Sequence, residues 1–192
     1  LVNRLLRHKT HFKFLNKKHD GVVLPILHLN GYKIANPTIF ARMSKEEINS
    51  FFKGCGWKPY IVEGKTNYDI HKKMVETLDL IVSEIKKIKK SAKRNNASTR
   101  PIWPMIVLKT PKGWTGPKVV DGKMIEDSFR AHQVPIIIKN DNDVKHLESW
   151  MKSYKPWELF DENGKLVEEL KEIIPDGDRR MGANPNANGG KL

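Results

Sequence analysis

Short, continuous apolar runs alternate with helical patterns between residues 22 and 108, and this alternation constrains the fold more than any other feature. Val22 to Leu29 (VVLPILHL) and Ile102 to Leu108 (IWPMIVL) are apolar runs of strand length, as expected for strands buried on both faces of a sheet. Strands joined through helices need crossover connections, which place neighbouring strands parallel. The sequence therefore predicts an α/β fold in which a mostly parallel sheet has helices on both faces.

Two helices and a short strand are predicted between these runs. Ser44 to Glu47 (SKEE) matches a capping box, so a helix should start there and end at Gly54-Cys55-Gly56. Pro59 to Val62 is a short strand candidate. A long helix is predicted over residues 70–94, because apolar residues recur there at steps of three and four: Ile70, Met74, Leu78, Ile81, Ile85 and Ile88. A polar break follows at residues 95–99.

Both apolar runs contain a proline, Pro25 in the first and Pro104 in the second. Proline cannot donate a hydrogen bond to a neighbouring strand, so Pro25 counts against a central position for the first strand.

The last third of the chain is predicted to contain two helices, over residues 141–154 and 165–173. Residues from 175 onward are rich in Gly, Asn and Pro and show no apolar periodicity, which is typical of a linker or tail. We therefore predict one domain over residues 1–174 and a linker over 175–192.

The chain is strongly basic, with 35 Lys and Arg against 22 Asp and Glu and a formal net charge of +13. The densest basic run, residues 86–94, lies on the polar side of the predicted long helix, so a solvated helix face is favoured over contact with nucleic acid.

No apolar run approaches the ~20 residues that a membrane helix needs. One cysteine, Cys55, excludes an internal disulfide framework. The first ten residues lack the apolar core of a signal peptide, and a cytoplasmic location is expected.

Ligands of parallel sheets bind beyond the carboxyl ends of the strands, which selects the loops at residues 30–33 and 110–118. Asn30-Gly31-Tyr32 is either a simple turn or a source of two hard oxygen ligands for Mg²⁺, the Asn side chain and a nearby backbone carbonyl. Lys112, between a proline and a glycine, is either a phosphate contact or a solvated loop lysine. His132 is either an acid, base or hydrogen-bond donor, or a packing residue.

Six segments closely resemble phosphoketolases, in the order found in that family. They are His28 to Thr38 (HLNGYKIANPT), Arg100 to Leu108 (RPIWPMIVL), Thr110 to Lys118 (TPKGWTGPK), Arg130 to Pro135 (RAHQVP), Leu159 to Gly164 (LFDENG) and Gly177 to Pro185 (GDRRMGANP). The resemblance covers nearly the whole chain from about residue 14 and includes both strand-end loops.

The resemblance implies a partial diphosphate-binding domain like that of transketolase, with thiamine diphosphate and Mg²⁺ as cofactors. Phosphoketolases cleave xylulose 5-phosphate or fructose 6-phosphate with inorganic phosphate, giving acetyl phosphate and a shorter aldose phosphate. By this resemblance the Asn30 side chain and the Tyr32 carbonyl hold the metal, and Lys112 lies near cofactor and substrate. His132 and Gln133 correspond to polar groups that face the substrate.

The family's metal-binding Asp and its cofactor-activating Glu are not among the segments that match, and the chain begins with Leu rather than Met. We therefore expect a fragment of a homo-oligomeric enzyme that is inactive alone. Two other functions stay open. One is a non-catalytic module that associates with an intact relative, and the other, less favoured, is a basic protein that binds polyanions.

Overall fold

The computed structural model describes residues 16–94 and 100–183, and contacts divide the chain into two compact units, residues 1–135 and 136–192. Each unit is described by itself.

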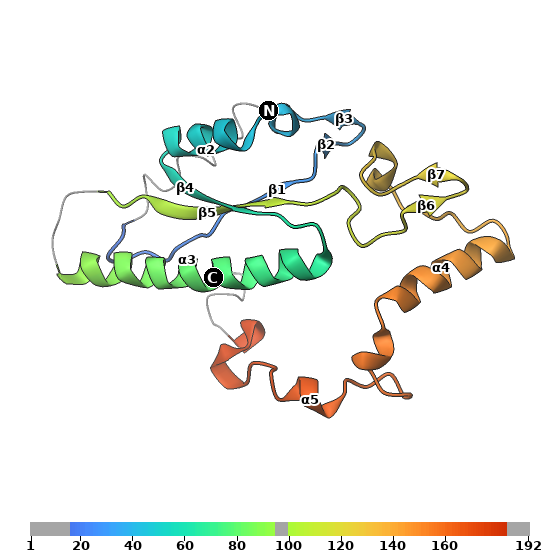
Figure 1. Cartoon of the computed structure of the whole chain (residues 1–192). Coiled ribbons are helices and arrows are strands. Elements are labelled where there is room, and N and C mark those ends of the chain that lie inside the picture. The colour runs from blue at the N-terminus through green and yellow to red at the C-terminus, as the bar shows by residue number, and fades with distance from the viewer. Residues whose placement is uncertain (1–15, 95–99, 184–192) are drawn as a thin grey trace, which may run out of the picture. The chain divides into compact units, whose positions relative to one another are not determined.

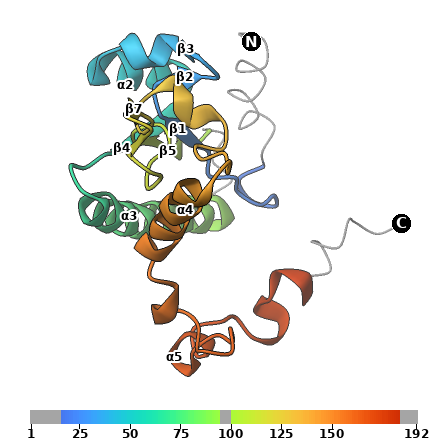
Figure 2. The same cartoon turned by 90° about the vertical axis from the view of Figure 1, so that its right-hand side faces the viewer.

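A parallel sheet of three strands forms the centre of the first unit. The strands are β1 (Ile26–Leu29), β4 (Trp57–Val62) and β5 (Trp103–Lys109), in the order β1-β5-β4. Helix α2 (Lys45–Gly54) lies over one face of the sheet and helix α3 (Asn67–Arg94) over the other, as both views show (Figure 1, Figure 2). The predicted α/β fold is confirmed.

The side chains of β5 alternate between the two faces and divide the core into two clusters. Trp103, Met105 and Val107 pack with Phe52 of α2, and Ile106 packs with residues of α3. The strand is buried on both faces because helices cover both, which is why its sequence is continuously apolar. The side chains packed around Ile106 include Val62, Ile70 and Ile81.

The two prolines occupy positions where no described strand needs their missing N–H. Pro25 immediately precedes β1, which is an edge strand. The N–H of Ile106 donates to the Pro25 carbonyl at 2.9 Å, on the side of β5 that faces β1. The N atom of Pro104, two residues earlier, faces that same side. Pairing with β1 begins only at Ile106, so Pro104 interrupts no pairing with that strand.

Helices α2 and α3 each begin at a reciprocal cap. The Ser44 Oγ accepts from the N–H of Glu47 at 3.1 Å, and the Glu47 carboxylate accepts from the N–H of Ser44 at 2.7 Å, as the capping-box prediction requires. Thr66 and Asp69 exchange two similar bonds of 3.1 Å each. This second cap starts α3 three residues earlier than the apolar stripe predicts.

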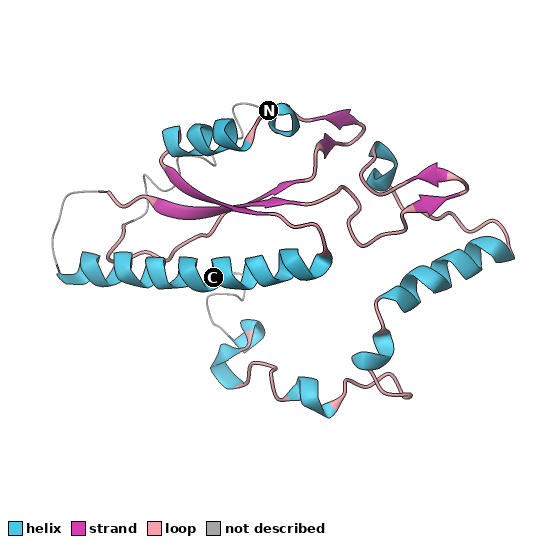
Figure 3. Cartoon of the chain, in the orientation of Figure 1, coloured by secondary structure: helices cyan, strands magenta, loops and turns pink. Residues whose placement is uncertain are grey.

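Two small hairpins were not predicted (Figure 3). Strands β2 (Tyr32–Lys33) and β3 (Asn36–Pro37) form the first, and β6 (Val119–Val120) and β7 (Lys123–Met124) the second. The second turns through Asp121-Gly122, whose φ angles of 50° and 71° are those of a type I′ turn. Such short pairs lack the alternating pattern that identifies longer strands. Two short 3-10 helices, Ile39–Arg42 and Phe129–His132, follow the hairpins.

The second unit contains helices α4 (Asp141–Ser153) and α5 (Glu168–Lys171) and three short 3-10 helices, Pro156–Glu158, Gly177–Arg179 and Met181–Ala183. Helix α4 agrees with the prediction, whereas the helix predicted over 165–173 is wrong in extent. The Asp161 carboxylate accepts from the N–H of Lys165 at 2.8 Å, and Leu166 forms a bridge with Phe160, so a turn and an extended segment occupy the start of that range.

Within the predicted linker, residues 177–183 contain two of these 3-10 helices; the predicted division at residue 174 stays a prediction. The polar break at 95–99 and the tail from 184 lie outside the described residues. Across the parts of the chain that the structure describes, no helix combines the length and apolar character required to cross a membrane.

Candidate functional site

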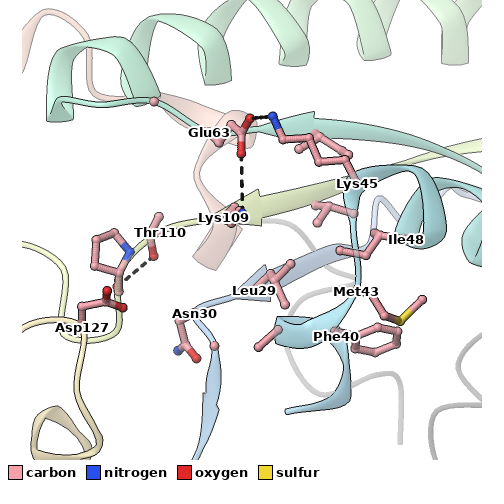
Figure 4. Close-up of a pocket in the computed structure, with 16 residues that line it drawn as sticks. Leu29, Asn30, Phe40, Met43, Lys45, Ile48, Glu63, Lys109, Thr110 and Asp127 are labelled. Carbon is pink, nitrogen blue, oxygen red and sulfur yellow. Dashed lines mark hydrogen bonds and ion pairs between the residues drawn. The ribbon is translucent and has the colours of Figure 1, made fainter. Parts of the chain in front are cut away.

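A pocket of about 310 Å³ lies at the carboxyl ends of the three parallel strands (Figure 4). Its apolar floor comes from the sheet, from α2 and from the segment that precedes α2. The polar side chains that line it lie at or just after the ends of β1, β4 and β5, or come from α2 and from the segment after β7: Asn30, Lys45, Glu63, Lys109, Thr110 and Asp127. The pocket therefore lies where a parallel sheet is expected to bind ligands.

Asn30 and Tyr32 follow β1 in a tight turn. The Asn30 Oδ1 accepts from the N–H of Tyr32 at 3.2 Å. The N–H of Thr38 donates to the Gly31 carbonyl at 2.9 Å, which makes the next pair, Tyr32 and Pro37, a non-hydrogen-bonded pair of the hairpin. The Tyr32 carbonyl consequently points away from β3. Both oxygens assigned to the metal by resemblance thus lie on one turn.

Lys112 is buried, with only 6% of its surface exposed. Its Nζ donates to the Ile34 carbonyl at 2.7 Å and lies 5.6 Å from the centre of the Tyr32 ring. Among the described residues, no carboxylate forms an ion pair with this ammonium group. A buried cation is costly without a compensating partner, so the group is suited to bind an anion. The solvated-lysine alternative is wrong for Lys112.

Backbone contacts join the Lys112 loop to the segment that carries His132 and Gln133. The N–H of Asp127 donates to the Lys112 carbonyl at 2.8 Å, and the Tyr32 hydroxyl lies 3.5 Å from the Asp127 carbonyl. The backbone at Gly113 passes directly against Ala131. His132 and Gln133 themselves are exposed. Of the predicted site residues, Asn30 lines the pocket, Tyr32 and Lys112 lie beside each other just outside its lining, and His132 and Gln133 are on an adjoining segment.

Several polar residues around the pocket were missed at the sequence level. Glu63 forms an ion pair with Lys45 and lies 3.9 Å from Lys109, and the hydrogen bond to Glu63 raises the pKa of Lys45. His28 Nε2 lies 2.6 Å from the hydroxyl of buried Thr110. Thr110 begins the loop that the strand-end rule had selected, and Glu63 directly follows β4, so the same rule applied to that strand would have identified it.

No group of three or more His, Cys, Asp or Glu side chains within residues 16–94 and 100–183 is arranged to hold a metal ion. A metal at this pocket would therefore need amide or carbonyl oxygens, such as that of Asn30, in addition to any carboxylate of the lining.

The sequence profile of the XFP N-terminal domain matches residues 6–192. A probable phosphoketolase of Clostridium acetobutylicum is 59% identical over 182 residues, which cover 94% of this chain and 23% of that protein. The chain belongs to the phosphoketolase family. Probable phosphoketolase 2 of a Nostoc species and the probable phosphoketolase of Nitrosomonas europaea are 59% and 56% identical over 182 residues, again 94% of this chain and 23% of each relative.

The resemblance to phosphoketolases carried by the six motifs is therefore confirmed, and the chain spans less than a quarter of the length of these family members.

Proposed function

We propose that the pocket is part of a phosphoketolase active site. The reaction is the cleavage of xylulose 5-phosphate or fructose 6-phosphate by inorganic phosphate, to acetyl phosphate and an aldose phosphate. The observation that carries the proposal is the buried Lys112 ammonium, which lies in a strand-end loop and has no carboxylate partner among the described residues. Sugar phosphates, inorganic phosphate and a diphosphate are all anions, and such a group would attract them.

Asn30 and Tyr32 fit a role in binding Mg²⁺ together with thiamine diphosphate. An amide oxygen and an outward-facing carbonyl are hard donors of the kind that Mg²⁺ prefers, and the Asn30 turn presents both. When bound, thiamine diphosphate supplies the carbanion chemistry that breaks the carbon–carbon bond of the ketose. This chain would contribute metal ligands from Asn30 and Tyr32 and would place charged and polar groups near the cofactor.

Lys112, His132 and Gln133 would act on the substrate. Lys112 offers a fixed positive charge, and an exposed imidazole such as that of His132 can exchange a proton or donate a hydrogen bond. Gln133 can donate and accept hydrogen bonds with sugar hydroxyls. We further propose that the isolated chain has no turnover, because it spans only 23% of its relatives' length and catalysis needs the complete set of groups held in place.

Isothermal titration of thiamine diphosphate with Mg²⁺ into the 192-residue chain tests the cofactor proposal. We expect binding that Asn30→Ala weakens at least about tenfold, as the loss of one metal ligand would. Lys33→Ala, on the same hairpin but outside the proposed site, is the matched control. Equal binding by Asn30→Ala and the unchanged chain would contradict the assignment of Asn30. Acetyl phosphate production by the purified chain would contradict its proposed inactivity.

The second unit supports the association function as a second candidate. Large apolar side chains are exposed throughout it, including Ile137, Met151, Trp157 and Phe160. Surfaces of this composition mark contacts with other polypeptides, in this family those of a homo-oligomer or of an intact relative. Light scattering during size-exclusion chromatography decides this candidate, because a monomer of 22.1 kDa over a wide concentration range would argue against it.

A further inference from the structure

Ile34 has a strained backbone at the tip of the β2–β3 hairpin. Its φ angle is 57°, in the left-handed region that β-branched residues rarely adopt. Ile34 is the first of the two turn residues between Lys33 and Asn36. In a turn where the first residue has a positive φ and the second does not, glycine is favoured at the first position. Its side chain is 56% exposed, so packing compensates little of this strain.

This strained turn residue also makes a contact far away in the sequence. The Ile34 carbonyl accepts the hydrogen bond from Lys112 at 2.7 Å, across 78 residues of sequence. The direction of a turn carbonyl depends on the φ and ψ angles of the residue that carries it, so a right-handed conformation at Ile34 would aim this oxygen elsewhere. Strain that persists at a residue without compensating packing points to a functional constraint at that place.

We propose that Ile34 is a positioning residue for Lys112. The left-handed backbone of Ile34 aims its carbonyl at the Lys112 ammonium group. The hydrogen bond holds the ammonium group beside the ring of Tyr32, which is on the turn that carries Asn30. Ile34 acts through its backbone and not through its side chain. The role of Lys112 itself rests on the proposed function above, whereas the coupling between Ile34 and Lys112 does not.

A pair of variants separates the backbone from the side chain. Ile34→Gly removes the side chain and permits the positive φ, whereas Ile34→Pro fixes φ near −65° and forbids it. The reaction of each lysine with acetic anhydride is followed by mass spectrometry in the 192-residue chain. We expect Lys112 to react about tenfold faster in Ile34→Pro and at the original rate in Ile34→Gly. Tenfold corresponds to the loss of one hydrogen bond to a charged group.

Lys58 serves as an internal reporter of global unfolding, because it is bonded to Glu84 on α3 at 2.9 Å, away from the hairpin. If Ile34→Pro merely unfolded the chain as a whole, labelling of Lys112 and Lys58 would increase together. An unchanged Lys112 rate in Ile34→Pro, or an equal increase in both variants, would overturn the proposal.

The reciprocal experiment does not depend on the folding of the proline variant. Because coupling between two groups is reciprocal, Lys112→Met should loosen the turn. We expect faster hydrogen–deuterium exchange in a peptide covering residues 31–38. No change is expected in Lys109→Met, which removes the more exposed lysine that ends β5, just before the Lys112 loop. Equal exchange in the two variants would refute the coupling. Neither measurement uses cofactor or substrate. If the chain fails to bind the cofactor but Ile34 and Lys112 are coupled as expected, the result counts against the proposed function and not against this proposal.

Discussion

Gly113 provides a sharp test of how the Lys112 loop is packed. Its φ angle is 71°, and a Cβ added to it would lie 2.5 Å from the Cβ of Ala131, on the segment that carries His132. Real Cβ atoms do not approach so closely, so Gly113→Ala must displace one of the two segments. The variant therefore incurs two separate penalties, one from the backbone and one from the contact.

The backbone penalty can be estimated from general values. A left-handed conformation costs an L-residue about 1–2 kcal/mol, and the lower entropy of the unfolded alanine variant offsets about 0.4–1 kcal/mol of this. Overpacking adds about 1–3 kcal/mol. We expect Gly113→Ala to lower the free energy of unfolding by about 2–4 kcal/mol, or the melting temperature by roughly 4–16 °C for a chain of this size.

Gly122→Ala is the matched control, because Gly122 has the same φ of 71° and no atom within 4 Å of an added Cβ. It should cost only the backbone part, about 1 kcal/mol. Urea unfolding of both variants, and of Gly113→Ala combined with Ala131→Gly, measures the contact part. The double variant should recover about 1–3 kcal/mol relative to Gly113→Ala. Equal destabilisation by Gly113→Ala and Gly122→Ala would refute the close contact.

Two further predictions concern the faces of the sheet. Phe52→Ala should lower the free energy of unfolding by about 3–5 kcal/mol in urea titrations, because Phe52 is only 3% exposed and packs in the core between α2 and the sheet. The control Tyr68→Ala removes a side chain on α3 that is 73% exposed, and should change the free energy of unfolding by less than about 0.5 kcal/mol. Burial raises the pKa of Glu84, but hydrogen bonds from Tyr60 (2.6 Å) and Lys58 (2.9 Å) outweigh it, so the net pKa lies below the ordinary 4.5. The stabilisation is therefore present above pH 4.5 and is lost as the pH falls through the lower folded-state pKa. Glu84→Gln should cost about 1–2 kcal/mol near neutral pH and progressively less as the pH falls below 4.5. A pH-independent difference would contradict this origin.

Local patterns were sufficient to predict much of the first unit. The capping box at Ser44 and the apolar stripe from Ile70 each specify a helix through neighbours in sequence, and both helices are present. The buried strand β5 was recognisable because both of its faces are covered. The strand-end rule selected the loops of Asn30 and Lys112, which line the pocket or lie beside it.

Features that depend on distant contacts could not be predicted. Nothing local indicates that the Lys112 ammonium bonds to Ile34, or that Ile34 adopts a positive φ. The helix predicted over 165–173 is shorter than predicted for the opposite reason. Its apolar spacing is adequate, but the Asp161 side chain accepts from the N–H of Lys165 in a turn, and the helix is confined to Glu168–Lys171. Short-range polar competition of this kind outweighs a weak helical pattern.

The order of the strands has a consequence for how the polypeptide folds during synthesis. β5 is the last of the three strands in the sequence and the central one in the sheet, and its partner in β1 lies 80 residues earlier, as in the pair Ile26 and Ile106. At about 5–20 residues per second, a ribosome completes β5 roughly 4–16 s after β1. During that interval β1 and β4 lack the strand between them, so the nascent chain exposes two unpaired apolar strands. Chaperones that hold extended apolar segments should therefore bind nascent chains that end before residue 103, and release them once β5 has emerged.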